Sequence, residues 1–155
     1  MAVFFGTFEN KVDRKGRVSV PAPFRQALAR SAFQGIIARP SYRSQAIEAC
    51  DLEFMEQLNE SVSATDLYSD AHEDLALTIF ADSYQLSFDS EGRILLPPAL
   101  VEHAGIAEQA GFVGMGSTFQ IWQPEILRQQ KAEARARARE QRLTLPLRRA
   151  PGDER

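Results

Sequence analysis

The feature of this sequence that most constrains its fold is an internal repeat. Residues 13–21 read DRKGRVSVP, and residues 89–97, 76 positions later, read DSEGRILLP. The Asp, Gly, Arg and Pro positions are identical, and apolar residues occupy matching positions on both sides. Self-similarity of this kind indicates two copies of one structural unit, each of about 50 residues.

Both copies predict the same order of elements: strand, turn, strand, short helix and a closing two-stranded hairpin. Asp and Gly at the first and fourth positions suit a type I turn followed by a left-handed residue. Polar and apolar residues then alternate, as in a half-buried strand. Proline cannot donate to a sheet but suits a helix start. The residues given a structural role are therefore Asp13, Gly16, Pro21, Asp89, Gly92, Arg93 and Pro97.

A unit this small buries too little apolar surface to be stable alone. We therefore predict an α+β fold in which a pseudo-symmetric pair of units shares one core, with helices at the periphery. The predicted divisions are residues 1–50 for the first unit, 51–82 for a helical spacer, 83–123 for the second unit, 124–142 for a C-terminal helix and 143–155 for a disordered basic tail.

Two helices are predicted in the spacer. Asp51 is placed to cap the first, and Asp70 with Glu73 has the spacing of a capping box before the second. Leu75 and Ile79 share one face of the second helix. An apolar face on an acidic spacer predicts association with further copies of the chain.

Charge is segregated along the chain, although the net charge is only -3. Residues 1–50 carry eight Lys or Arg against three acids, whereas residues 51–123 carry one Arg against thirteen acids. A basic first segment can meet a polyanion while the acidic middle faces elsewhere. The basic residues of interest are Arg14, Lys15, Arg17, Arg25, Arg30, Arg39 and Arg43.

Composition argues against several classes of protein. Apolar residues make up 44% and charged residues 25%, as in an ordinary globular protein. No run approaches the roughly 18 apolar residues of a membrane helix, and the single cysteine, Cys50, leaves no disulfide within the chain. We expect a cytoplasmic, nucleoid-associated protein with no membrane partner.

Catalytic and metal-binding constellations are not evident. The two histidines, His72 and His103, lie far apart, and with one cysteine they give no zinc spacing. Cys50 is expected to be a small packed residue. Asp13 and Asp89 lie in turns where Asp has a structural role. We predict no enzymatic activity, no metal and no cofactor.

Arg14, Lys15 and Arg17 lie within or beside one tight hairpin loop. A two-stranded ribbon can enter the major groove, where Arg contacts guanine O6 and N7 together. Lys and Arg also neutralise phosphates. The second copy has Ser90 and Glu91 in place of the basic pair, so its arginine is interpreted as a structural partner of the turn Asp.

The motifs at residues 13–21 and 89–97, over residues 1–142, resemble the MraZ family, bacterial transcriptional regulators with two tandem SpoVT/AbrB-type units. The resemblance implies AbrB-like swapped-hairpin β units and assembly into ring-like homo-oligomers. It also implies binding to short G-containing DNA repeats upstream of the division and cell-wall gene cluster. The DNA contacts that it implies fall on Lys15 and Arg17, with Arg14 beside them.

Other functions remain open at this point. An antitoxin-like AbrB autoregulator would bind a toxin, although such proteins are typically one short unit with a tail. A structural assembly module would form the ring without a DNA preference. A hydrolase using Asp13 or Asp89 would show turnover that does not depend on Lys15. Selection of bound sequences from a random duplex pool separates these functions.

Overall fold

The structure is a computed structural model that describes residues 1–146. The chain divides into two compact parts, Met1–Pro124 and Glu125–Arg155. Both repeat units lie in the first part. Residues 1–146 form eight strands: β1 (Thr7–Lys11), β2 (Arg17–Ser19), β3 (Gly35–Pro40), β4 (Ile47–Cys50), β5 (Tyr84–Ser87), β6 (Arg93–Leu95), β7 (Gln109–Gly114) and β8 (Phe119–Trp122).

The helices in the same residues are α1 (Ala22–Ala27), α2 (Leu52–Ser63), α3 (Asp70–Ala76), a π-helical turn η1 (Leu77–Ala81), α4 (Pro98–Ala104) and α5 (Pro124–Glu140). As predicted, α1 begins after Pro21 and α4 after Pro97. Gly105, in the left-handed region at φ +65°, ends α4. Helix α5 lies where a C-terminal helix was expected over residues 124–142, whereas most of the predicted tail, residues 147–155, lies outside the described residues.

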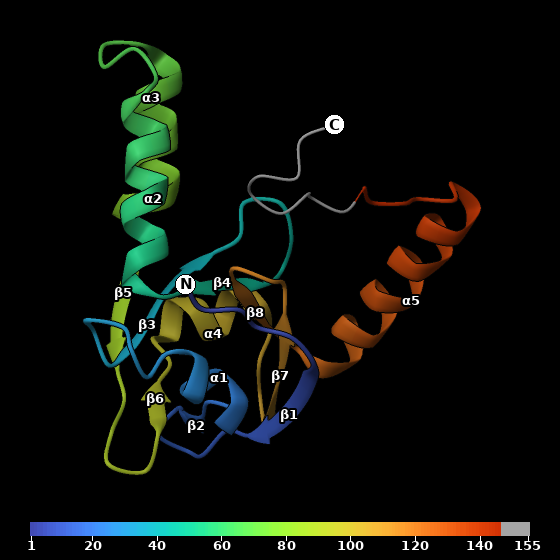
Figure 1. The fold of residues 1–155 in the computed structure, drawn as a ribbon. Coiled ribbons are helices and arrows are strands. Elements are labelled where there is room, and N and C mark those ends of the chain that lie inside the picture. Colours follow the sequence, from blue (N-terminus) through green and yellow to red (C-terminus); the bar gives the residue numbers. More distant parts are fainter. Residues whose placement is uncertain (147–155) are drawn as a thin grey trace, which may run out of the picture. The chain divides into compact units, whose positions relative to one another are not determined.

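Six strands form one antiparallel sheet in the order β1-β7-β8-β4-β3-β5 (Figure 1). The hairpins β3–β4 and β7–β8 meet in its centre through β4 and β8. At the edges, β1 of the first unit pairs with β7 of the second, and β5 of the second pairs with β3 of the first. The α+β class is confirmed. The swapped-hairpin arrangement stays an interpretation of this strand order.

The remaining two strands, β2 and β6, one from each unit, form a two-stranded sheet, and Val18 of β2 also forms an isolated bridge with Val12. Val18 and Ile94 lie opposite each other in this pair, and both are 1% exposed. They belong to a single apolar core to which both units contribute. Phe24 of α1 lies in that core, with its ring centroid 4.9 Å from that of Phe119 on β8.

Helices α2 and α3 lie side by side and project from the sheet as a helical arm, shown in green in Figure 1. Asp51 caps α2 as predicted, because its Oδ1 accepts a hydrogen bond of 2.7 Å from the backbone N–H of Phe54. Ile79 of η1 is buried, whereas Leu77 is 57% exposed. The arm therefore keeps part of its apolar surface in solvent.

The predicted capping box at Asp70 and Glu73 is wrong. Ser69 is the residue with the extended backbone of an N-cap, and its Oγ accepts a hydrogen bond of 3.1 Å from the backbone N–H of His72. Asp70 is already helical. Because Asp, Ser and Glu all favour the first turn, sequence alone did not fix which of them ends the preceding loop.

Substitution of Phe24 by Ala should destabilise the fold strongly. Its ring also makes edge-on contacts with Phe4 and Phe8, with centroids 5.4 and 5.5 Å apart, so truncation leaves a cavity between the two units. We expect a loss of about 3–5 kcal/mol in the free energy of unfolding by denaturant titration. The control Phe5→Ala, at a side chain 77% exposed, should stay within about 0.5 kcal/mol of wild type. Equal losses would contradict a shared core at Phe24.

Candidate nucleic-acid interface

The ribbon of β2 and β6 has one face in the core and one in solvent. Side chains alternate along a strand, so the residues flanking Val18 and Ile94 point away from the core. Arg17 lies opposite Leu95, and Ser19 lies opposite Arg93. The two arginines are therefore diagonal neighbours on one face, with Cα atoms about 7–8 Å apart.

The first loop is closed by the carboxylate of Asp13. Its Oδ1 accepts hydrogen bonds from the backbone N–H groups of Lys15 and Arg17, at 3.0 and 2.8 Å. Its Oδ2 accepts a hydrogen bond of 2.6 Å from Arg17 Nε, which also forms an ion pair. Gly16 takes a φ of +88°, which glycine adopts without the penalty of a Cβ. One side chain thus sets both the turn and the direction of Arg17.

The second loop repeats this network at Asp89. Oδ1 accepts from the backbone N–H groups of Glu91 and Arg93, both at 2.9 Å, and Oδ2 accepts from Arg93 Nε at 2.8 Å. Gly92 takes a φ of +75°. The pairing of Arg93 with Asp89 is as predicted. The same pairing of Arg17 with Asp13 was not predicted, although the identical spacing of the two motifs indicates it.

The loops differ at the ends of the two arginines. Glu91 Oε2 lies 2.8 Å from Arg93 Nη2, so a second carboxylate engages that guanidinium. Lys15 occupies the position of Glu91 in the first loop, and within residues 1–146 no carboxylate contacts the Nη groups of Arg17. Arg17 therefore presents two donors to solvent, and Lys15 and Arg14 are exposed beside it.

The electrostatics of the two loops follow from these contacts. The pKa of Asp13 lies below its ordinary value of 3.8, chiefly because the backbone N–H of Arg17 donates to the carboxylate. The pKa of Asp89 is lowered in the same way by the backbone N–H of Arg93. The pKa of Arg93 is raised, first by its hydrogen bond to Asp89 and further by the charges of Asp89, Glu91 and Asp13. The charge of the first loop thus acts on the second.

Arg25 hydrogen-bonds the backbone of the first unit and lies against the second loop. Its Nε donates to the carbonyl oxygen of Val20 at 2.9 Å. Its side chain also lies against Gly92, where an added Cβ would come within 2.7 Å of Arg25 Cδ. The repeat position of Arg25 in the second unit is Val101, so the repeat gave no signal for this contact.

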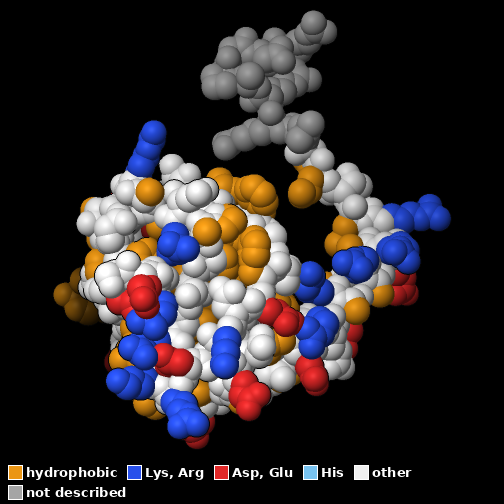
Figure 2. Space-filling view, turned by 90° about the horizontal axis from the view of Figure 1, so that it is seen from below, with side chains coloured by type: hydrophobic (Ala, Val, Ile, Leu, Met, Phe, Trp, Pro, Cys, Tyr) orange, Lys and Arg blue, Asp and Glu red, His pale blue; other side chains and the backbone are white. Residues whose placement is uncertain are grey.

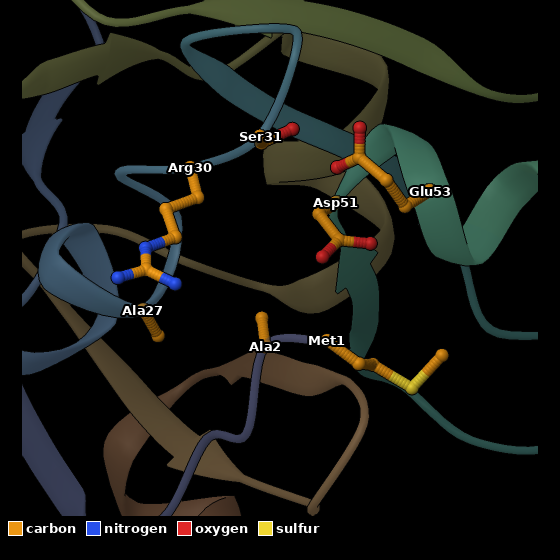
Figure 3. Close-up of a pocket in the computed structure, with 7 residues that line it drawn as sticks. All are labelled: Met1, Ala2, Ala27, Arg30, Ser31, Asp51 and Glu53. Carbon is orange, nitrogen blue, oxygen red and sulfur yellow. The ribbon is translucent and has the colours of Figure 1, made fainter.

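The other basic candidates lie on other elements. Arg39 lies on β3, opposite Glu48 in the sheet. Arg30 lines a pocket of about 210 Å³ with Asp51 and Glu53 (Figure 3). Both acids there have structural partners: Asp51 caps α2, and Glu53 accepts from the backbone N–H of Ala32 at 3.2 Å. Seen from the end that carries β2 and β6, basic and acidic side chains lie interspersed on the body (Figure 2).

The residues considered for catalysis have packing roles. Burial raises the pKa of the Cys50 thiol to about 12, as expected of a small packed residue. His103 Nε2 lies 3.1 Å from the carbonyl oxygens of Ser44 and Ala46, which ties α4 to the β3–β4 loop. Among residues 1–146, no cluster of three or more His, Cys, Asp or Glu is arranged to hold a metal ion. No helix in this range is long and apolar enough to span a membrane.

Comparison with known proteins decides the family. The MraZ sequence model, described as "MraZ protein, putative antitoxin-like", matches residues 3–39 and 79–148. Transcriptional regulator MraZ of Rickettsia bellii (strain OSU 85-389) is 47% identical over 146 residues, which is 94% of this chain and 97% of that protein. The chain belongs to the MraZ family. The similarly named protein of Rickettsia canadensis (strain McKiel) is 47% identical over 145 residues, with the same coverage.

Both MraZ relatives are named as transcriptional regulators, and regulation of transcription is the function class of this chain. The predicted family is confirmed. The matched segments of the MraZ model include both Asp-x-x-Gly-Arg motifs, so the two loops described above lie in the part of the chain that defines the family.

Protonation of Asp13 and Asp89 should reduce stability in acid. Both have a folded-state pKa below the ordinary value of 3.8, so their stabilisation is complete above that value and is lost as the pH falls through the folded pKa. The melting temperature of the double variant Asp13→Asn/Asp89→Asn should therefore fall less than that of wild type between about pH 5 and pH 2.

The matched control is Asp74→Asn, at an exposed residue of α3 whose carboxylate accepts no hydrogen bond from the residues that the structure describes. It should keep the wild-type dependence of melting temperature on pH. A double variant with the same dependence as wild type would contradict a stabilising role for the two loop carboxylates.

Proposed function

We propose that this chain regulates transcription by binding double-stranded DNA through the β1–β2 loop, with Arg17 reading guanine. The observation that carries the proposal is the state of the Arg17 guanidinium. Asp13 engages its Nε, which fixes the plane of the group, while the two Nη groups remain available as donors. A fixed pair of donors matches the O6 and N7 acceptors of guanine in the major groove.

Lys15 and Arg14 supply the contacts that do not depend on sequence. Both are exposed at the tip of the same loop, where they can neutralise the phosphates that border the groove. The second loop contributes less because Glu91 adds a negative charge beside Arg93. Arg93 is therefore assigned to stability, together with Asp13, Gly16, Pro21, Asp89, Gly92 and Pro97.

The proposed targets are short promoter repeats of the division and cell-wall gene cluster, bound in the nucleoid of the cytoplasm by a ring-like homo-oligomer. One loop makes few base contacts, so several linked copies that bind successive repeats are needed for high affinity. Exposed apolar side chains on the helical arm support self-association: Leu67 is 63% exposed, Tyr68 91% and Leu77 57%.

A second candidate is an antitoxin-like protein whose partner is a toxin. The description of the matched family as antitoxin-like favours it. Such a protein would also bind its own operator, so DNA binding alone does not separate the two candidates. Copurification of a second, unrelated chain that depends on the helical arm would favour the antitoxin.

Substitutions in the two loops test the DNA-binding proposal. Arg17→Ala should weaken binding to a sequence selected from a random duplex pool by about 1–3 kcal/mol per contact and reduce the preference over random DNA. Lys15→Ala should weaken binding to both DNAs and lower the salt dependence. Fluorescence anisotropy at two salt concentrations measures both effects.

Arg93→Ala is the matched control, because its arginine occupies the same position in an equivalent loop. It should lower the melting temperature while the selected sequence is retained. Loss of target binding in a folded Arg93→Ala protein, with normal binding by Arg17→Ala, would show that the second loop is the one that reads DNA.

Light scattering tests the assembly. The chain has a mass of 17.3 kDa, and at micromolar concentration we expect several times that value. Tyr68→Ser with Leu67→Ser should reduce the mass, whereas Tyr42→Ser, at a side chain 69% exposed in the β3–β4 loop, should not. A monomer mass for the wild-type chain would contradict the ring.

A further inference from the structure

We propose that Glu91 determines how many bases of a DNA site one protein chain recognises, by keeping the second loop from contacting DNA. This inference rests on the proposed DNA binding through Arg17. Without Glu91, Arg93 would read a second guanine, two or three base pairs from the one read by Arg17. Glu91 is therefore a specificity-determining residue of the interface.

The backbone already places both arginines for this purpose. The two loops share the same five hydrogen bonds: two backbone N–H groups on Asp Oδ1, the arginine Nε on Asp Oδ2, the Gly N–H on the Asp carbonyl and the Asp N–H on the Arg carbonyl. Both also have a left-handed Gly. Arg17 and Arg93 also lie on the same face of the β2–β6 ribbon. Their separation of about 7–8 Å corresponds to roughly two base-pair steps of about 3.4 Å.

Glu91 opposes DNA binding at this position in two ways. Its Oε2 engages Arg93 Nη2 at 2.8 Å, which removes one of the two donors needed for a bidentate contact with guanine. Its side chain is 67% exposed, so its charge faces the side from which phosphates would approach. Ion pairs at such exposed positions contribute little to stability. Removal of Glu91 should therefore release Arg93 without unfolding the loop.

The first loop shows the arrangement expected of the second loop once Glu91 no longer engages Arg93. Residue 91 is aligned with Lys15, so the two loops carry opposite charges at the same place. In both loops the turn uses only the backbone N–H of this residue, donated to the Asp Oδ1. A change of side chain at residue 91 thus leaves the turn contacts in place.

The test uses the full chain and two variants, Glu91→Lys and Glu91→Gln. In selection from a random duplex pool, both should enrich sites with an additional guanine two or three base pairs from the first. Glu91→Lys should bind the extended site about 5- to 150-fold more tightly than wild type does, which is the range for one bidentate contact. Arg93→Ala, added to Glu91→Lys, should cancel both the gain and the additional guanine.

Glu56→Lys is the control for bulk charge. It makes the same change of charge at an exposed residue of α2, on the helical arm at the opposite end of the body from the β2–β6 ribbon (Figure 1). It should leave the selected sequence unchanged. If Glu91→Lys gains no more than Glu56→Lys, or if its gain survives Arg93→Ala, the role of Glu91 is overturned.

Failure of the proposed function gives a different result. If the wild-type chain shows no DNA preference, or if Arg17→Ala leaves that preference unaltered, the DNA-binding proposal and this inference are both overturned. Wild-type reading through Arg17, with an unchanged selected sequence in both folded Glu91 variants, overturns the inference alone. Melting curves identify a variant that does not fold, and Glu91→Gln, which keeps the size of the side chain, then decides.

Discussion

Strands β2 and β6 come from different units and pair with each other, which brings Val18 against Ile94 in the shared core. The ladder continues into both loops, because Leu96 N–H donates to the carbonyl of Gly16 and Val20 N–H donates to that of Gly92. Each unit also gives its first strand to the edge of the other unit's hairpin. Neither unit can therefore bury its apolar surface without the other, and the two arginine loops occupy fixed positions on one ribbon.

Within each loop, one carboxylate closes the turn and orients the arginine. Backbone N–H groups bind Asp Oδ1 and the arginine Nε binds Oδ2, so the guanidinium is held before any partner arrives. A donor group fixed in advance loses less conformational entropy on binding. The ion pair with Asp13 therefore does not prevent Arg17 from binding a partner. It restricts the motion of the side chain but leaves the two Nη groups available as donors.

The repeat predicted much of the fold, because turns, helix starts and strand alternation depend on residues close in sequence. The turn glycines, the helix starts after Pro21 and Pro97, and the helix end at Gly105 were all predicted. The two closing hairpins, β3–β4 and β7–β8, were predicted as well. Strand pairs between the units were not, since the pairing of β2 with β6 joins residues about 76 positions apart and leaves no local pattern. At the site, the ion pair of Arg93 with Asp89 was predicted and is present, whereas the DNA contacts of Arg14, Lys15 and Arg17 stay a prediction. The contact of Arg25 with Gly92 and the ion pair of Glu91 with Arg93 depend on side-chain positions that only the folded chain defines.

The repeat also separates the positions that build the loop from those that choose its partner. Asp, Gly and Arg must be the same in both copies, because each makes a contact that closes the turn. Of the two residues between Asp and Gly, the second donates its backbone N–H to the Asp, and neither side chain takes part in closing the turn, so the side chains can differ without loss of the turn. Those two positions hold Arg and Lys in the first copy and Ser and Glu in the second. Under the proposed DNA binding, a charge change there alters the partner of the loop and not its shape, which allows two copies of one scaffold to differ in function.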